Sequence, residues 1–577
     1  MSRFAVLAGW LVAAACLAVL PMISSGYVIY ILNLLMVYLV LALGMHIVIG
    51  EAGQFSLAHA AFYGIGIYTA AILNNAFHFP FFVNVVAAGL LAAVVGLVIS
   101  GLSLRMRDIY LALATFAFGE AMLWVLLNWE SMTGGPNGLR FSPANLFGLE
   151  IASDKQAYLF VLGLTALFLW ATLQLAASRL GSAFRAVRES EVAAMAMGIN
   201  VKRTKMAAFT LSAFYAGCAG GMYTLFSSFI HPESLGFQTT ILILTMVVVG
   251  GLGSVYGVMG GVIIFGLISE FLRQALSFQE IIYGVILTIF MMYICCAAYS
   301  RSFRSNTASG GSRMADNFLE VQGISVVFGG LKAVNNFSLS VEKGTIHALI
   351  GPNGAGKSTT FNCISRYYQP TTGRILLEGV DITHRQPFEM AGLGVARTFQ
   401  NLELFNELTV MENVLLGTFA GSRGRLSELM SKPKAASVEW VAHLMESVGL
   451  TKYRDTKARN LDFGHQKLLE LARAWALKPK LLLLDEPAAG LRNQEIETLD
   501  RLLRQFVEKE GMTVLLVEHV MQLVMSISDR VTVLSFGEKI SEGLPDEVRN
   551  DAAVIEAYLG SEHEAESNSE EGASQHV

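Results

Sequence analysis

The segment GPNGAGKST at 351–359 holds the residues of this chain that are best suited to phosphate chemistry. It fits the pattern G-x-x-x-x-G-K-[ST] at every fixed position and directly follows the apolar run IHALI. Such a loop turns backbone N–H groups toward phosphate oxygens at the positive end of the next helix. We expect Lys357 to reach the β- and γ-phosphates and Ser358 to hold Mg²⁺. The predicted nucleotide-binding set is Gly351, Pro352, Asn353, Gly354, Ala355, Gly356, Lys357, Ser358 and Thr359.

Two later apolar runs end in groups that could complete a hydrolytic site. LLLLDEP at 481–487 predicts a buried strand in the middle of a parallel sheet, with Asp485 at its carboxyl edge beside the metal. Glu486 would then orient or deprotonate the attacking water. VLLVEHV at 514–520 predicts another buried strand, which delivers His519 near the γ-phosphate. The predicted catalytic residues are Glu486, His519 and Lys357, and the predicted cofactors are ATP and Mg²⁺.

The composition divides the 577 residues into two kinds of domain. Only 15% of the residues are charged, against roughly 25% in ordinary soluble proteins. The deficit lies before residue 300, where apolar stretches of membrane-spanning length occur at 5–24, 27–50, 55–77, 80–104, 109–128, 157–177, 206–229, 239–272 and 281–299. The predicted fold class is therefore an α-helical multi-span membrane domain followed by an α/β phosphate-loop ATPase domain. The net charge of −5 argues against a nucleic-acid partner.

Four consecutive parts follow from these patterns. We expect a transmembrane domain at 1–300, a flexible Ser/Gly-rich linker at 301–316, an ATP-binding domain at 317–561 and a disordered acidic tail at 562–577. Basic residues place the loop 178–205 and the turn containing Arg105 and Arg107 inside the cell, and loop 131–156 outside. With the ATPase domain in the cytoplasm, the segment 239–272 should enter and leave on one side. The run GGLGS at 250–254 therefore predicts a re-entrant or tightly bent helical pair.

Other features of the apolar half leave two interpretations open. The small residues of segment 53–69 favour close helix packing, or they form an unwound turn that lines a substrate path. Glu51, His59, Glu120 and Glu270 lie in or near apolar spans, where ionisable groups are costly and usually face a bundle interior. A structural partner and a transport role are equally compatible with each, and His59 is the first to test.

From residue 317 onward, the order of the motifs resembles an ATP-binding-cassette (ABC) ATPase. The resemblance implies that Phe328 lies under the adenine, although an ordinary core position is the alternative. Gln400, in ARTFQNLELF, corresponds to the flexible glutamine loop, which makes Ser358, Gln400 and Asp485 the implied metal ligands. The implied signature contacts to the nucleotide of an opposite subunit come from Asp462, Gly464 and Gln466.

The signature segment departs from the common LSGGQ form. It reads LDFGHQ at 461–466, and an acidic side chain near a phosphate is unfavourable unless it points away. Arg492 also stands where many relatives carry an acidic residue. These departures leave open whether this signature serves a fully active site.

The whole chain resembles the branched-chain (hydrophobic) amino acid uptake transporters. Residues 317–561 are similar to their ATPase subunit in FGGLKAVNN, RTFQNLELFNELTVMENVLLG, LDEPAAGL and GLPDEVRNDAAVIEAYLG. Residues 27–300 are similar to their permease in GQFSLAHAAFYGIG, TGGPNGL and GGLGSVYG. The family makes these as separate chains, so this one looks like a fusion. The resemblance also implies a coupling segment with an E-A-A…G pattern, matched by Glu191, Ala194 and Gly198 in the loop placed inside.

The resemblance implies an ATP-driven importer subunit in the bacterial inner membrane, for branched-chain or related hydrophobic amino acids. Urea, short amides or aromatic acids are the alternative substrates. Implied partners are a second permease, a second ATPase and an extracytoplasmic solute-binding protein; the complex would be heteromeric, with a homodimer as the alternative. An exporter half-transporter is disfavoured because nothing in 1–300 is long and polar enough for its cytoplasmic extensions. The coupling-like loop argues against a non-transport membrane ATPase.

Overall fold

The computed structural model of the chain describes residues 20–22, 24–103, 108–146, 149–150, 154–272, 317–419, 431, 434–519 and 521–558. Most of the predicted span 5–24, the span 281–299, the linker, the acidic tail, Arg105 and Arg107 lie outside them, as does the side chain of Glu270. The chain forms two compact units, one of residues 1–188 and 201–301 and one of residues 189–200 and 302–577. The four-part division stays a prediction.

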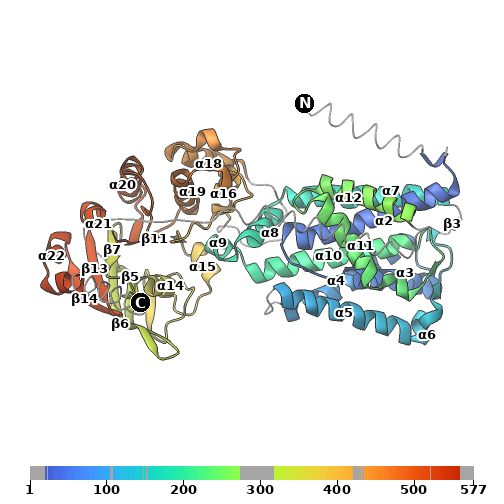
Figure 1. Cartoon of the computed structure of the whole chain (residues 1–577), viewed down its shortest axis with the longest axis horizontal. Coiled ribbons are helices and arrows are strands. Elements are labelled where there is room, and N and C mark those ends of the chain that lie inside the picture. Colours follow the sequence, from blue (N-terminus) through green and yellow to red (C-terminus); the bar gives the residue numbers. More distant parts are fainter. Residues whose placement is uncertain are drawn as a thin grey trace, which may run out of the picture. The chain divides into compact units, whose positions relative to one another are not determined.

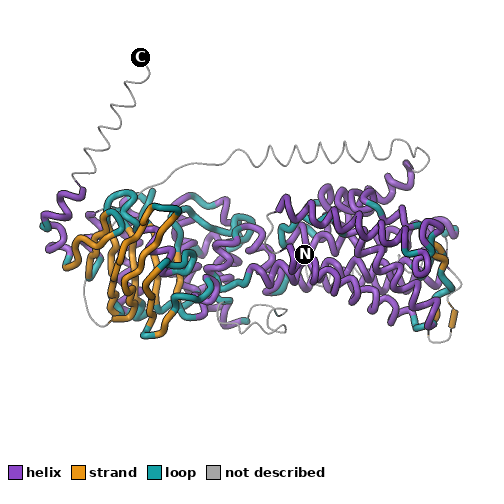
Figure 2. The backbone as a smooth tube through the Cα atoms, turned by 90° about the horizontal axis from the view of Figure 1, so that it is seen from below, coloured by secondary structure: helices purple, strands orange, loops and turns teal. Residues whose placement is uncertain are grey.

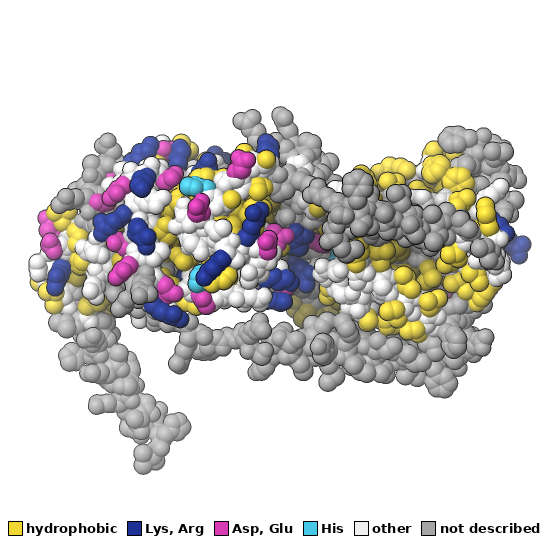
Figure 3. Space-filling model, turned by 90° about the horizontal axis from the view of Figure 1, so that it is seen from above, with side chains coloured by type: hydrophobic (Ala, Val, Ile, Leu, Met, Phe, Trp, Pro, Cys, Tyr) yellow, Lys and Arg dark blue, Asp and Glu magenta, His cyan; other side chains and the backbone are white. Residues whose placement is uncertain are grey.

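The first unit is a bundle of apolar helices (Figure 1). Within the described residues, five helices are long and apolar enough to cross a membrane: Gly26–Glu51, Phe81–Leu102, Ile109–Asn128, Lys155–Ala176 and Pro232–Gly250. Apolar side chains gather over the surface of the bundle, as Figure 3 shows. A helix that is apolar on all sides either lies in a protein core or spans a membrane, and the exposed apolar side chains of this bundle favour a membrane. The longer helices are α2 (Gly26–Met45), α3 (His59–Phe77), α4 (Phe81–Ser103), α5 (Asp108–Asn128), α7 (Asp154–Ala176), α8 (Arg179–Glu189), α10 (Val201–Tyr223), α11 (Phe237–Gly250) and α12 (Val255–Leu272).

Glycines allow the helices at the centre of the bundle to pack at close range. An added Cβ on Gly66 of α3 would overlap the backbone of Gly217 on α10. A Cβ on Gly217 would in turn meet the carbonyl oxygen of Ala88 and the side chain of Ala92 on α4. Such contacts are typical of membrane helices, which associate through small residues. The close-packing interpretation of segment 53–69 is therefore confirmed.

The predicted break at GGLGS is present. Helix α11 ends at Gly250 and α12 begins at Val255, and the two helices pack against each other. Added Cβ atoms show the direction of the pair, because one on Gly250 would meet Gly257 and one on Gly261 would meet Met246. These contacts run in opposite directions along the two helices, so the pair is tightly bent. That it enters and leaves on one side of the membrane stays a prediction.

The stretch before α3 is also non-helical, as one interpretation of segment 53–69 required. Helix α2 continues into a π-helix, η1 (His46–Glu51), and the backbone then runs without helix to His59. The N–H of Gln54 donates to the Val48 carbonyl at 2.8 Å, and the N–H of Leu57 donates to the Thr115 hydroxyl at 2.9 Å. A backbone carbonyl and a side-chain hydroxyl thus replace helical hydrogen bonds that an irregular backbone loses in a membrane. The lining of a substrate path by this turn stays a prediction.

The intramembrane ionisable groups have different surroundings. The Glu51 carboxylate lies 3.4 Å from the Arg185 guanidinium, and Nε2 of His59 lies 2.8 Å from the Leu41 carbonyl oxygen. Both residues are buried and have structural partners. Glu120, midway along α5, is exposed, and it borders a small cavity that Ala60 of α3 and Thr240 of α11 also line. The expectation that such groups face the bundle interior is confirmed for Glu51 and His59 and stays a prediction for Glu120.

The second unit is built on two β-sheets, drawn in orange in Figure 2. The strands β5 (Asn317–Phe328), β6 (Leu331–Glu342), β8 (Thr372–Leu377) and β9 (Val380–Asp381) form an antiparallel sheet in the order β6-β5-β8-β9. The larger sheet has the order β10-β11-β12-β7-β13-β14. Its strands are β7 (Ile346–Ile350), β10 (Val395–Arg397), β11 (Leu481–Asp485), β12 (Thr513–Val517), β13 (Arg530–Ser535) and β14 (Glu538–Gly543). All its pairs are parallel except β13–β14.

Helices pack against the larger sheet or against one another and complete the predicted α/β fold. They are α14 (Lys357–Ile364), α15 (Pro387–Gly392), α16 (Val410–Gly417), α18 (Ala435–Ser447), α19 (Phe463–Ala476), α20 (Asn493–Glu508), α21 (Met521–Ile527) and α22 (Pro545–Arg549). Every residue of β7, β11 and β12 is buried, as expected for central parallel strands. The short helix α9 (Glu191–Ala196) also belongs to this unit. The predicted fold class, a helical membrane domain followed by an α/β ATPase domain, is confirmed.

Substitution of Gly217 by valine tests the packing of the bundle. The new side chain would press on the backbone of α4, and overpacking costs about 1–3 kcal/mol. We expect a lower midpoint of thermal unfolding for the detergent-solubilised protein carrying Gly217→Val. Gly163→Val on α7 is the matched control, because an added Cβ there meets nothing within 4 Å. Equal midpoints for the two variants would contradict the close packing.

Candidate nucleotide-binding site

The order of the large sheet explains why distant sequence motifs meet. Strands β10, β11, β12 and β7 are neighbours and run parallel, so their carboxyl ends lie at the same edge. Four loops leave from this edge, and ligands of open α/β sheets bind outside the carboxyl ends of the strands. The loops begin after Ile350, Arg397, Asp485 and Val517. These positions precede the predicted phosphate loop, Gln400, Glu486 and His519, respectively.

A cavity of about 320 Å³ opens at this edge. It is lined by ten of the predicted residues together with four others. The predicted ones are Asn353, Gly354, Ala355, Gly356, Lys357, Ser358, Thr359, Gln400, Glu486 and His519; the others are Leu331, Lys332, Ala333 and Phe536. Gly351 and Pro352 lie beside it, since their carbonyl oxygens accept hydrogen bonds from the Lys357 ammonium at 2.7 and 2.9 Å. The structure therefore gathers the predicted phosphate loop and catalytic residues around one space.

The Lys357 ammonium is buried in its own loop. Burial lowers the pKa of Lys357 to about 8, while the charges of Glu486 and Asp485 oppose that shift. Two backbone carbonyls hold the ammonium where the loop turns into α14. A phosphate entering the loop would supply the negative charge that the buried cation lacks.

Glu486 occupies the centre of the polar groups in the cavity. Its Oε1 atom lies 2.9 Å from Nε2 of His519 and accepts a hydrogen bond from the Gln400 amide at 3.2 Å. The hydrogen bond from His519 is the main cause that lowers the pKa of Glu486, so the carboxylate is ionised and able to accept a proton. Its backbone has a φ of +47°, a strained conformation for a non-glycine residue that is common at functional sites.

Asp485 lies behind the cavity rather than on its wall. Its Oδ2 atom forms a buried ion pair with Arg397 at 3.0 Å, and its Oδ1 atom has no hydrogen-bond partner among the described residues. Burial raises the pKa of Asp485, and Arg397 opposes this shift. Arg397 also donates to the Asn362 amide oxygen at 2.7 Å and to the Ser365 hydroxyl at 2.5 Å. Sequence reasoning missed Arg397, although a charged residue at the end of a buried strand is a usable signal.

The aromatic position predicted under the adenine is not on the cavity wall. The Phe328 side chain is half exposed and packs edge-to-face against Tyr368, so it is not an ordinary core residue either. Its cross-strand neighbour Leu331 lines the cavity instead, together with Phe536. Phe536 is 86% exposed, which is unusual for a large apolar side chain and leaves its ring free for a ligand. Its sequence context gave no signal.

The signature residues lie apart from this cavity. Asp462 caps the N-terminus of α19, where its carboxylate accepts from the N–H of His465 at 3.0 Å and contacts the His465 ring at 2.7 Å. The backbone hydrogen bond is the main cause that lowers the pKa of Asp462. Gln466 donates to the Ala458 carbonyl at 3.2 Å, and an added Cβ on Gly464 would meet the Glu495 carboxylate of α20. The Asp462 carboxylate is thus bound to the first turn of α19, the helix that it caps.

The predicted coupling residues lie on or next to α9. Ser190 caps this helix by accepting from the Ala193 N–H at 3.1 Å, and its hydroxyl donates to Glu403 at 2.6 Å. The Tyr367 hydroxyl donates to the Val192 carbonyl at 2.8 Å. Glu191 opens α9, Ala194 is fully buried in it, and Gly198 has a φ of +77° in the turn that follows. Helix α9 packs against α15.

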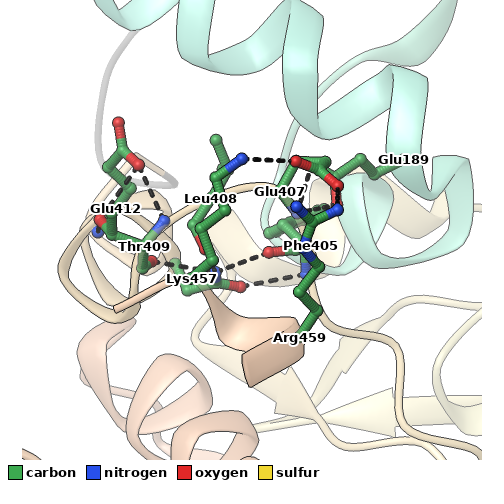
Figure 4. Close-up of polar contacts among 9 residues, drawn as sticks. Glu189, Phe405, Glu407, Leu408, Thr409, Glu412, Lys457 and Arg459 are labelled. Carbon is green, nitrogen blue, oxygen red and sulfur yellow. Dashed lines mark hydrogen bonds and ion pairs between the residues drawn. The ribbon is translucent and has the colours of Figure 1, made fainter. Parts of the chain in front are cut away.

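Glu407 lies at the centre of a cluster of charged residues that also contains Glu189, Lys457 and Arg459 (Figure 4). The Glu407 N–H donates to the Glu189 carboxylate, with N–O distances of 3.0 and 3.2 Å. The Glu407 carboxylate in turn accepts from Lys457 at 2.7 Å and from Arg459. Lys457 and Arg459 lie just before the signature segment. Glu407 therefore links Glu189 to the loop that precedes α19.

The chain matches three known families along its length. Residues 27–295 match the family described as "Branched-chain amino acid transport system / permease component". Residues 334–489 match the family described as "ABC transporter", and residues 538–564 match "Branched-chain amino acid ATP-binding cassette transporter". The two halves thus correspond to a permease and an ATPase.

Individual relatives show the same division. The "High-affinity branched-chain amino acid transport ATP-binding protein BraF" of Pseudomonas aeruginosa is 42% identical over 253 residues, which cover 43% of this chain and 99% of that protein. The "High-affinity branched-chain amino acid transport system permease protein LivM" of Escherichia coli is 34% identical over 309 residues, covering 49% of this chain and 73% of that protein. A crystal structure of a nucleotide-free ATP-binding cassette from an ABC transporter is 33% identical, covers 42% of this chain and 99% of its own, and gives a TM-score of 0.39.

Nucleotide binding is expected to depend on pH through Lys357. The pKa of this lysine is about 8 in the nucleotide-free protein, so its positive charge is lost as the pH rises through 8. Bound phosphate favours the charged form, so binding at pH 9 should take up a proton. We expect ATP affinity to fall above pH 8 by at most about tenfold per pH unit.

Titration calorimetry in buffers of different ionisation enthalpy measures this proton uptake. A Lys357→Gln variant should bind ATP more weakly and without the pH dependence. Unchanged affinity between pH 8 and 9.5, with no proton uptake, would contradict the role of Lys357.

Proposed function

Because the chain belongs to the family of branched-chain amino acid ABC transporters, with a permease part and an ATPase part on one polypeptide, we propose that it is an importer subunit. It is a membrane protein whose ATPase couples ATP hydrolysis to transport. The proposed activity is the uptake of branched-chain or related hydrophobic amino acids across the bacterial inner membrane. The observation that carries this proposal is the cavity that gathers Lys357, Glu486 and His519 in a unit that also contains the segment 189–200.

The proposed roles in hydrolysis follow from the geometry. The phosphate loop and Lys357 bind the phosphates. The lowered pKa of Glu486 keeps its carboxylate ionised, so that it can orient the attacking water and accept its proton. His519 lies 2.9 Å from Glu486 and orients it, while Gln400 holds the same oxygen from the other side. The strained backbone of Glu486 fixes the direction in which the carboxylate points.

The residues present also fit a magnesium ion. Ser358 and Gln400 line the cavity, and the buried Oδ1 atom of Asp485 has no partner among the described residues. Hydroxyl, amide and carboxylate oxygens are the ligands that Mg²⁺ prefers. When bound, the ion would neutralise charge on the β- and γ-phosphates.

The signature residues are separate from the cavity that contains the phosphate loop, and this separation supports the need for a second cassette. The signature residues Asp462, Gly464 and Gln466 do not line the cavity in the chain itself. We therefore infer that they face nucleotide on another subunit, and that Phe328 lies near the adenine edge of its own site. The turned-back carboxylate of Asp462 removes the expected conflict with a phosphate, because its charge is shared with the His465 N–H and ring.

A second permease is supported by α5. Glu120 is exposed in the middle of this apolar helix, and a carboxylate in contact with lipid is costly. A second permease subunit, different from this one in a heteromeric complex or identical in a homodimer, would cover it. An extracytoplasmic solute-binding protein would deliver the substrate. Urea, short amides and aromatic acids remain the alternative cargoes.

Uptake into membrane vesicles, with the solute-binding protein present, tests the function. We expect labelled leucine to accumulate inward with ATP but not with a non-hydrolysable analogue. In a Glu486→Gln variant, ATP hydrolysis should fall about 100-fold or more and uptake should be lost, while ATP still binds. Accumulation of urea or an aromatic acid instead of leucine would reassign the substrate. No uptake of any of these, with robust ATPase activity, would contradict the importer.

The contact between Tyr367 and Val192 tests the coupling segment. Tyr367→Phe removes only the hydroxyl that donates to the Val192 carbonyl, and a hydrogen bond contributes about 0.5–1.5 kcal/mol. We expect a decrease of roughly two- to tenfold in leucine transported per ATP hydrolysed, with ATP affinity unchanged. Tyr368→Phe at the adjacent exposed position is the matched control. An unchanged transport ratio in Tyr367→Phe would argue against this role of the segment.

A further inference from the structure

Arg397 is a buried arginine to which the proposed function gives no role. It is the last residue of β10, and only 7% of its surface is exposed. Its Nη2 atom donates to Oδ2 of Asp485 at 3.0 Å. Its Nη1 atom donates to the Asn362 amide oxygen at 2.7 Å and to the Ser365 hydroxyl at 2.5 Å. Because a guanidinium is planar and rigid, these bonds fix the relative positions of the three groups that accept them.

The bonds of Arg397 join the two elements that carry proposed magnesium ligands. Asp485 is the last residue of β11. Asn362 lies on α14, which begins at the phosphate loop and carries Ser358 in its first turn. Asn362 follows Ser358 by about one helical turn, so the two residues share one side of α14. Arg397 therefore ties the helix of one proposed ligand to the strand of the other.

The Asp485 carboxylate is held in a single orientation. Its Oδ2 atom accepts the bond from Arg397, while its buried Oδ1 atom has no hydrogen-bond partner among the described residues. The Asp485 N–H also donates to the hydroxyl of Thr398, the residue after Arg397, at 3.3 Å. A buried carboxylate oxygen without a partner is costly, and a divalent cation would compensate it. The bond from Arg397 thus leaves one oxygen of Asp485 for the metal.

Three aromatic rings surround the Arg397 guanidinium. Its central carbon lies 5.2 Å from the ring centroid of Phe399, 5.5 Å from that of Tyr367 and 5.7 Å from that of Phe361. Such rings attract a cation and take the place of water around it. Hydrogen bonds in surroundings of this kind are stronger than in water. The position of Arg397 is therefore well defined.

We propose that Arg397 is a positioning residue for the magnesium ion of the ATP site, which holds the Asp485 carboxylate and the helix of Ser358 so that both ligands reach one ion. This inference rests on the proposed metal-binding roles of Ser358 and Asp485. Arg397 is not among the residues that line the cavity, so it acts through these ligands. Removal of a group that orients metal ligands typically lowers metal affinity 10–100-fold.

A positioning role and a simple effect of charge have opposite consequences. If only the charge of Arg397 mattered, its removal would relieve repulsion of the incoming cation, and metal affinity would rise. If Arg397 positions the ligands, metal affinity falls when the side chain becomes apolar. It falls with lysine too, since an ammonium is a point charge and cannot span the acceptors that the planar guanidinium joins. Arg397→Met and Arg397→Lys therefore separate the two effects.

Metal binding to the full-length, detergent-solubilised chain tests the proposal. Mn²⁺ is the probe, a non-hydrolysable ATP analogue is held by an excess of protein, and EPR spectroscopy gives the dissociation constant of Mn²⁺. We expect this constant to rise about 10- to 100-fold in both Arg397→Met and Arg397→Lys. The affinity for the analogue in EDTA should stay unchanged, because Arg397 does not line the cavity.

Control variants separate the positioning of the metal ligands from a general loss of packing. Arg530→Met removes an arginine that pairs with Glu542 at 3.4 Å where β13 begins, at the opposite edge of the same sheet, and should leave Mn²⁺ affinity unchanged. Tyr367→Phe keeps the ring beside Arg397 and should also leave it unchanged. Asp485→Asn should weaken Mn²⁺ binding by itself, and Arg397→Met should then have no further effect.

Unchanged or tighter Mn²⁺ binding in Arg397→Met, together with weaker binding in Asp485→Asn, would overturn the proposal and leave the metal role of Asp485 intact. Additive effects of these two substitutions would overturn it as well, as would unaltered Mn²⁺ binding in Arg397→Lys. If Arg397→Met does not fold, Asn362→Leu replaces it, because this variant removes one acceptor of the guanidinium, and unchanged Mn²⁺ binding would be the overturning result. Unchanged Mn²⁺ binding in Asp485→Asn would instead refute the proposed metal role of Asp485, and this inference with it.

Discussion

The parallel register of β10, β11, β12 and β7 is the constraint on which the whole nucleotide site depends. The pairing aligns Asp485 with Val517, so the loops after β11 and β12 start at the same level of the sheet. A slip of one residue would turn every side chain of a strand to the opposite face. Every residue of β7, β11 and β12 is buried, and the one carboxylate in these strands, Asp485, is the last residue of β11. Chemistry is confined to the single edge where the strands end.

The same strands explain how much of the site could be predicted from the sequence. Lys357, Glu486 and His519 each follow a short apolar run, and position after a buried strand is enough to place them at the edge. Phe328 could not be placed in this way, because the end of a hairpin can turn either side chain toward a ligand. The structure puts its neighbour Leu331 on the cavity wall.

In the helical half, glycine predicted the break between α11 and α12 because few other residues allow so sharp a bend within a membrane. The surroundings of Glu120 were not predictable. A helix with apolar residues on all sides carries no sequence pattern that tells which side is covered by protein. Glu51 and Glu120 look alike in the sequence, yet only Glu51 is buried against an arginine.

In the loops of the ATPase unit, which lack the regular backbone hydrogen bonds of helices and strands, buried polar side chains bind the backbone. Asn413 is fully buried, donates to the carbonyls of Phe405, Leu408 and Thr409, and accepts from the Phe405 N–H. It shapes the turn that carries Glu407. Glu470 and Glu518 act in the same way on the segments before Gln400 and around His519. A buried polar side chain without hydrogen-bond partners is costly, so we expect each of these side chains and the loop it binds to become ordered together.

The π-helix at the end of α2 is attached to the neighbouring helix α8. The Gly50 carbonyl in this π-helix accepts a hydrogen bond from Arg188, and the Glu51 carboxylate forms an ion pair with Arg185. Both arginines belong to α8, so this helix holds the end of α2 at two neighbouring points, the Gly50 carbonyl and the Glu51 carboxylate. This double attachment fixes the position from which the non-helical backbone of residues 52–58 leaves toward α3.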